Sequence, residues 1–105
     1  MSSKIKDLPH KEFSSKRFKT VRTPYFFIKI KKNESFFGRV GVVAGKSAGK
    51  TAVERNFLKR QARGVLSKNL TAGNDVLVVF LRGASDVAKK EIRQELINAT
   101  QKAQK

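Results

Sequence analysis

The segment DVLVVFLR, residues 75–82, is apolar from Val76 to Leu81. A strand with one face in water alternates apolar and polar residues, whereas a strand covered on both faces is apolar nearly throughout. We therefore predict a strand at 75–82 that lies in the centre of a sheet. Gly83 follows the run and ends the strand.

Two segments upstream predict further strands of the same sheet. Residues 24–31, PYFFIKIK, alternate in character, as expected for a strand with two different faces. One face carries Phe26, Ile28 and Ile30, and the other carries Tyr25, Phe27, Lys29 and Lys31. Residues 36–45, FFGRVGVVAG, predict a second strand that runs antiparallel to the first.

Three segments predict helices around these strands. Residues 50–68 form the longest, and residues 9–16 form a short first helix, because proline fits the first helical turn. A last helix is capped by Ser85 or Asp86 and buries one apolar stripe. This stripe consists of Ala88, Ile92, Leu96, Ala99 and Ala103.

The order of these elements is helix, strands, helix, strand and helix, which predicts a small α+β sandwich. Its sheet is covered mainly on one side. The 105 residues have room for one such domain. Residues 1–8 are polar and predict a flexible basic N-terminal segment, and residues 9–105 form the single domain.

The charge of the chain is strongly positive. Lysine and arginine number 24 against 8 aspartate and glutamate residues, for a formal net charge of +16. Such an excess repels itself in a compact chain and is favourable when a polyanion neutralises it. Nucleic acid is therefore the first expected partner, ahead of an anionic membrane surface or an acidic protein.

Several classes of protein are excluded by composition. The chain has no cysteine, which excludes disulfide frameworks and cysteine-based zinc sites, and His10 alone cannot form a histidine-rich metal site. No apolar run approaches the roughly 20 residues of a membrane helix. The first residues lack the apolar core of a signal peptide, so we expect a cytoplasmic protein.

The predicted helix at 50–68 has a basic side without acidic residues. On a helical wheel this side consists of Arg55, Asn56, Lys59, Arg60 and Arg63, which we call the basic arc. The neighbouring side consists of Leu58, Ala62, Val65 and Leu66 and packs on the sheet. Like charges at i, i+4 and i+8 repel each other, whereas a solubilising face usually mixes signs. The arc therefore favours an RNA or DNA surface over a solvated one.

The polar face of the strand at 24–31 allows two interpretations. Aromatic side chains beside lysines suit the stacking of bases next to a phosphate backbone. The alternative is that other apolar groups cover this face. The strand alone does not decide between them.

Residues 44–51, AGKSAGKT, match a relaxed phosphate-loop pattern between a strand and a helix. In that interpretation Lys50 holds nucleotide phosphates and Thr51 holds Mg²⁺, and the protein is a nucleotide hydrolase. Against it, Ala44 replaces the first glycine, and the later strand ends in Arg82 rather than an acidic residue. We expect instead a loop that lets an RNA backbone come close.

These residues together resemble the bacterial ribonuclease P protein family. The signature of that family is Arg-Asn-x-x-Lys-Arg-x-x-Arg, which the basic arc matches, preceded by a loop with Lys46 and Lys50. PYFFIKI, GRVGVVAGKS and DVLVVFLRGAS are similar to strands of the family, so that the resemblance covers about residues 8–100. It implies an α-β-β-β-α-β-α fold with a four-stranded sheet, an extra strand near 18–22 and a left-handed crossover between the last two strands.

The resemblance also implies a function. The family forms the protein subunit of the ribonuclease P ribonucleoprotein, an endoribonuclease that removes the 5′ leader of precursor tRNA. Its partners are the catalytic RNA and precursor tRNA, with no membrane and no obligate protein partner. The RNA carries out the hydrolysis and binds most of the Mg²⁺, so no catalytic or metal-binding residue is expected in this chain.

The resemblance assigns two sets of site residues. The residues that contact the RNA are Lys46, Lys50, Arg55, Asn56, Lys59, Arg60 and Arg63. The residues of a leader cleft between the first helix and the sheet are Phe13, Phe18, Tyr25, Phe27 and Lys29. One departure is Phe57, where the family commonly has a basic residue, and it weakens one RNA contact. The alternative function is a structural RNA-binding protein of ribosomal type, without a substrate cleft.

Overall fold

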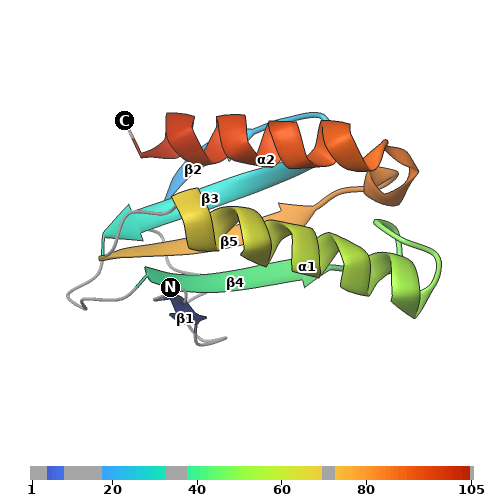
Figure 1. The fold of residues 1–105 in the computed structure, drawn as a ribbon, viewed down its shortest axis with the longest axis horizontal. Helices are drawn as coiled ribbons and strands as arrows, with labels where there is room; N and C mark the ends of the chain where they lie inside the picture. Colours follow the sequence, from blue (N-terminus) through green and yellow to red (C-terminus); the bar gives the residue numbers. More distant parts are fainter. Residues whose placement is uncertain (1–4, 9–17, 33–37, 70–72, 105) are drawn as a thin grey trace.

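A computed structural model of the chain describes residues 5–8, 18–32, 38–69 and 73–104. The strands are β1 (Ile5–Asp7), β2 (Lys19–Arg22), β3 (Phe26–Lys32), β4 (Gly38–Ala44) and β5 (Asn74–Phe80). The helices are α1 (Ala52–Asn69) and α2 (Lys89–Ala103), with a short 3-10 turn, η2 (Ala84–Asp86), before α2 (Figure 1). None of the described helices is long and apolar enough to cross a membrane.

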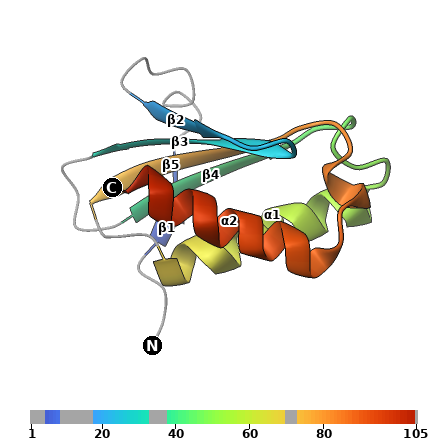
Figure 2. The ribbon, with the colours of Figure 1, turned by 90° about the horizontal axis from the view of Figure 1, so that it is seen from above.

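The sheet has the strand order β1-β4-β5-β3-β2, so the predicted central strand is central. β5 pairs antiparallel with β3 and parallel with β4. β3 and β4 run in opposite directions, as expected, but they are not neighbours because β5 lies between them. Figure 2 shows α1 and α2 on the same face of the sheet, which confirms the α+β sandwich.

The connection from β4 through α1 to β5 is a left-handed crossover. In Figure 1 the arrows of β4 and β5 point the same way, β5 lies above β4, and α1 passes in front of the sheet. Figure 2 shows the same arrangement from above. Nearly all such crossovers are right-handed, so this hand, and the strand β2 near 18–22, confirm what the resemblance implied.

The N-terminal segment differs from the prediction of a flexible tail. Ile5–Asp7 pair in parallel with Gly38–Val40 and add a fifth strand at the edge of the sheet. Leu8 is buried, and its backbone N–H donates to the carbonyl of Val40 at 3.0 Å. An open strand edge pairs through backbone groups, so the polar sequence of this segment does not prevent it from pairing with β4. The predicted first helix at 9–16 lies outside the described residues.

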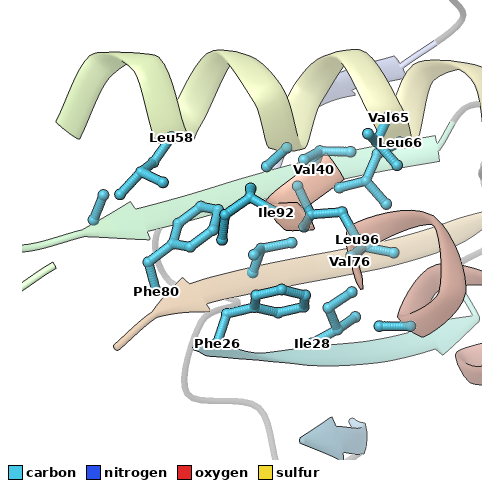
Figure 3. Close-up of a cluster of buried hydrophobic side chains, with 14 of the residues drawn as sticks. Phe26, Ile28, Val40, Leu58, Val65, Leu66, Val76, Phe80, Ile92 and Leu96 are labelled. Atoms are coloured by element: carbon cyan, nitrogen blue, oxygen red, sulfur yellow. The ribbon is translucent and has the colours of Figure 1, made fainter. Parts of the chain in front are cut away.

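The core lies between the sheet and the two helices (Figure 3). The predicted alternation of β3 is confirmed, since Phe26, Ile28 and Ile30 are all buried. Phe26 also meets Phe80 of β5 edge-on, with ring centroids 5.7 Å apart. The helices contribute Leu58, Ala62, Val65, Leu66, Ile92, Leu96, Ala99, Thr100 and Ala103.

The start of α2 differs from the prediction. Ser85 and Asp86 lie in η2, and the extended backbone of Val87 separates that turn from the helix. Ala88 is the N-cap of α2 and makes no capping side-chain hydrogen bond. Ala88 is also exposed, so it does not belong to the buried stripe in which we predicted it.

A buried ion pair joins β4 to β5 on the face of the sheet that lies away from the helices. Asp75 is fully buried, and its two carboxylate oxygens accept hydrogen bonds from Nε and Nη2 of Arg39 at 2.7 and 2.6 Å. Arg39 and Asp75 are paired residues in the parallel ladder. Since a bidentate pair has a fixed geometry, it favours this one register of β4 against β5.

We predict that Arg39→Ala lowers the free energy of unfolding by about 1–3 kcal/mol, because it takes from the buried carboxylate of Asp75 the guanidinium that donates to both of its oxygens. Urea unfolding followed by circular dichroism measures this change. The control is the double variant Arg39→Met/Asp75→Leu, which leaves no buried charge and is expected to lose less stability. A loss below about 1 kcal/mol for Arg39→Ala would contradict the role assigned to the pair.

Candidate nucleic-acid interface

A capping box begins α1. The Oγ1 of Thr51 accepts a hydrogen bond from the N–H of Glu54 at 3.1 Å. In return the carboxylate of Glu54 accepts hydrogen bonds from the N–H groups of Thr51 at 3.2 Å and Lys50 at 2.8 Å. The spacing Thr-x-x-Glu is typical of this motif, which satisfies backbone donors that the first helical turn leaves free. The box fixes where α1 starts and therefore which way its side chains point.

The same hydrogen bonds argue against a nucleotide site at 44–51. A phosphate loop needs free backbone N–H groups, and those of Lys50 and Thr51 already donate to Glu54. The negative carboxylate in that place also repels a phosphate. Within the part of the chain that the structure describes, no three His, Cys, Asp or Glu side chains gather to hold a metal ion.

The loop between β4 and α1 is held against the loop before η2. The carbonyls of Ser47 and Ala48 accept hydrogen bonds from the N–H groups of Gly83 and Ser85, at 3.2 and 3.0 Å. Ala48 is buried beneath this contact. The exposed cations Lys46 and Lys50 therefore project from an anchored loop.

Arg82 joins these two lysines around a shallow hollow of about 280 Å³. Arg82 is exposed and lies just after β5. Nothing in the sequence pattern groups Arg82 with the loop lysines, because the two loops meet only in the folded chain. The hollow gathers three cations, and its lining also includes the acidic residue Asp86.

The basic arc lies along the solvent side of α1, and its members differ in their surroundings. Asn56, Lys59 and Arg60 are exposed. Arg55 is half-buried, and its Nη1 donates to the carbonyl of Gly49 at 2.9 Å. Arg63 is half-buried as well. Arg55 thus supports the loop before α1, whereas Lys59 and Arg60 present their charge to the solvent.

The face of the sheet away from the helices carries aromatic rings beside cations, and we call it the aromatic–basic face. It consists of Phe18, Arg22, Phe27, Lys29 and Lys31. Cζ of Arg22 and Nζ of Lys29 each lie 5.6 Å from the centroid of the Phe27 ring. Nζ of Lys31 lies 5.2 Å from the centroid of Phe18. Cations at these distances interact with the electron-rich faces of the rings.

The structure therefore brings together part of the predicted leader cleft. Phe18, Phe27 and Lys29 lie on the aromatic–basic face, and Phe13 lies outside the described residues. Tyr25 precedes β3 and packs, partly buried, against the core cluster, so the alternation of β3 does not extend to it. Arg22 was missed because the strand β2 has no clear sequence pattern.

The two surfaces face different directions. α1 packs on the core face of the sheet, and the aromatic–basic face is the opposite one. A surface of cations on a helix suits the phosphates of a structured nucleic acid. Aromatic rings beside cations suit the bases and backbone of a single strand.

Comparisons with known proteins agree with this geometry. Residues 9–104 match the model of the family Ribonuclease P. The chain is 42% identical over 59 residues to the "Ribonuclease P protein component" of Ralstonia pickettii, which is 54% of this chain and 42% of that protein. It is 40% identical over 72 residues to the protein of the same name from Lactobacillus delbrueckii subsp. bulgaricus, which is 66% of this chain and 58% of that protein. The matched segments thus span about half the length of these relatives.

Solved structures show the same fold. The RNase P protein of Staphylococcus aureus superposes with a TM-score of 0.82 at 23% identity, over 97% of this chain and 96% of that one. The RNase P protein of Thermotoga maritima superposes with a TM-score of 0.71 at 28% identity, over 83% of this chain and 84% of that one.

We predict that Arg55→Ala lowers the stability of the free protein and Arg60→Ala does not. The first variant removes a charged hydrogen bond of about 1 kcal/mol to the carbonyl of Gly49, which lowers Tm by about 4–8 °C in a domain of this size. Thermal unfolding followed by circular dichroism measures both. Equal Tm values for the two variants would show that Arg55 has no role in the fold.

Proposed function

Since the chain belongs to the ribonuclease P protein family, we propose that it is the protein subunit of a ribonuclease P ribonucleoprotein. In this role it binds the catalytic RNA and the 5′ leader of precursor tRNA and promotes the maturation of the 5′ end of tRNA. The enzyme is an endoribonuclease, and the RNA carries out its hydrolytic chemistry. The observation that carries the proposal is the basic arc of α1, which contains no acidic residue and exposes Asn56, Lys59 and Arg60. The exposed loop cations Lys46 and Lys50 lie just before the helix.

The contribution of the protein is electrostatic. The catalytic RNA and its substrate are both polyanions that repel each other, and a chain of formal charge +16 lowers that repulsion. Lys59 and Arg60 are exposed one after the other on α1, so they reach phosphates without any change of the fold. The guanidinium of Arg60 offers planar, bidentate donors to a phosphate.

The leader binds on the aromatic–basic face. Phe27 is flanked by the cations Arg22 and Lys29, so a base that stacks on the ring has cations beside its phosphates. Every base has a flat face, so this binding has little sequence preference. That suits a protein whose substrates carry different leaders.

Mg²⁺ belongs to the RNA in this proposal. We propose that RNA phosphates bind most of the Mg²⁺ and that the protein contributes no catalytic residue. The ion supplies Lewis acidity and neutralises phosphate charge where the RNA holds it. We place the protein in the cytoplasm, without a membrane or an obligate protein partner.

We predict that the protein stimulates cleavage of a precursor tRNA by a bacterial ribonuclease P RNA at low Mg²⁺ and near-physiological salt. The variant Lys59→Ala/Arg60→Ala is expected to lose most of this stimulation. It avoids Arg55, which also supports the fold. Because this variant loses two phosphate contacts, the slope of log affinity for the RNA against log salt concentration is expected to decrease in magnitude by about 1.5.

The matched control is Lys32→Ala/Lys102→Ala, which removes the same charge from exposed positions outside the arc. It is expected to keep the stimulation. If wild type binds the RNA tightly and does not stimulate cleavage, the protein is a structural RNA-binding protein of ribosomal type. If the two double variants behave alike, net charge and not the arc is responsible.

We further predict that Phe27→Ala weakens the binding of precursor tRNA only when the leader is several nucleotides long. Stacking of a base on an aromatic ring contributes about 1–3 kcal/mol, so the affinity falls about 5- to 150-fold. The measurement compares a long-leader substrate with one whose leader is a single nucleotide, in the presence of the catalytic RNA. An equal loss for both substrates would place Phe27 outside the leader site.

A further inference from the structure

The two helices lie side by side and run in the same direction (Figure 1). Nζ of Lys89 lies 5.0 Å from the ring centroid of Phe57. One turn further along both helices, Nε of Arg93 donates to Oε1 of Gln61 at 3.3 Å. Near the other end, Nε2 of Gln104 donates to the carbonyl of Asn69 at 2.8 Å. These contacts join α1 to α2 along their length.

A groove of about 360 Å³ lies between the two helices on the solvent side. Its lining includes three cations, Arg60 and Lys68 from α1 and Arg93 from α2. No acidic residue is among the described residues that line it. Lys89 lies one turn before Arg93 on the same side of α2, so the row of cations continues past the groove.

The side of α2 that faces α1 carries cations and no acidic residue, whereas the opposite flank carries Glu91 and Glu95 together with Lys102. Lys89 and Arg93 face α1, as their contacts show. At about 100° per residue, Glu91 and Glu95 fall on the flank of α2 that faces away from α1. An arrangement that served only solubility would mix the two signs on each side. Here the positive side borders the groove.

The first turn of α2 is also unfavourable for cations. Lys89 and Lys90 lie at the N-terminus, where the helix dipole disfavours positive charge, and Ala88 offers no capping side chain. Glu91 is the acidic residue of this turn, and the two lysines gain nothing from the helix dipole, although Lys89 contacts the ring of Phe57. An anionic partner would offset this cost.

Gly64 provides an observation that is independent of charge. It lies inside α1 and lines the groove. Glycine is less favourable than alanine in a helix interior. A Cβ at this position would have nothing within 4 Å, so the packing of the protein does not require glycine here. The missing side chain instead leaves space in the floor of the groove.

We propose that the groove between α1 and α2 binds the ribose-phosphate backbone of the catalytic RNA as a second contact beside the basic arc. Lys68, Arg93 and Lys89 bind phosphates, and the backbone lies close to α1 over Gly64. Arg60 belongs to both the arc and the groove, so the two surfaces are continuous on one side of the molecule. This continuity favours the catalytic RNA over the leader, which we place on the opposite face of the sheet. The inference rests on the proposed function.

The first test removes charge from the groove without touching the arc. The variant Lys68→Ala/Arg93→Ala is compared with the control Lys32→Ala/Lys102→Ala, in which Lys102, like Lys68, lies in the last turn of its helix. Binding to a transcribed bacterial ribonuclease P RNA is measured over a range of salt concentrations. The groove variant is expected to bind about tenfold more weakly than the control, with a salt slope lower by about 1.5. Equal binding by the two variants would overturn the proposal.

The second test fills the groove without changing the charge. Gly64→Ala is expected to raise Tm by several degrees, and Gly64→Gln is expected to keep Tm at or above that of wild type. Gly64→Gln places a long side chain where the RNA backbone would lie, so its affinity for the RNA is expected to fall at least about fivefold. Wild-type affinity of a stably folded Gly64→Gln would overturn the proposal.

The outcomes separate this inference from the proposed function. If wild type binds the catalytic RNA and Lys59→Ala/Arg60→Ala loses that binding while the groove variants do not, only the groove proposal fails. If wild type does not bind the RNA, both fail. Precursor tRNA alone serves as a second probe. The groove variants are expected to lose less affinity for this RNA than for the catalytic RNA.

Discussion

The central strand β5 is hydrogen-bonded along both edges, and these hydrogen bonds determine where the other elements lie. β4 pairs with it in parallel and β3 pairs with it antiparallel. One face of the strand supplies Val76, Val78 and Phe80 to the core beneath the two helices. The other face holds the carboxylate of Asp75 against Arg39. Because a parallel neighbour needs a long connection, α1 has to cross the sheet, and its basic arc faces outward.

The sequence predicted the elements whose pattern is set by burial. The run from Val76 to Leu81 and the alternation of Phe26, Ile28 and Ile30 follow directly from which faces are covered. It did not predict β1, because an edge strand pairs through its backbone and needs no apolar pattern. The hand of the crossover came from the family resemblance, since the general rule predicts the opposite hand.

The residues of the candidate site likewise include some that the sequence predicts and some that it does not. The basic arc was predictable because residues three and four apart on one helix share a side. Arg82 and Arg93 were not, because each joins a surface through a contact between segments that are distant in sequence. Arg22 was not predictable because the strand β2 has no clear sequence pattern. The phosphate-loop pattern, which we set aside from the sequence alone, shows a related limit of short motifs. Its Lys50 and Thr51 N–H groups bind Glu54, and a short motif does not show which acceptor its donors will meet.

At Phe57 a cation of α2 lies where the basic residue common in the family would extend from α1. A basic residue at this position would lie beside Lys89 and near Arg93, and the like charges would repel each other. The half-buried ring of Phe57 instead holds the ammonium of Lys89 at 5.0 Å. A positive charge therefore remains on this part of the surface, although it comes from α2 rather than α1. The ring of Phe57 contacts α2 at the same time, so one side chain both joins the helices and positions a cation at the surface.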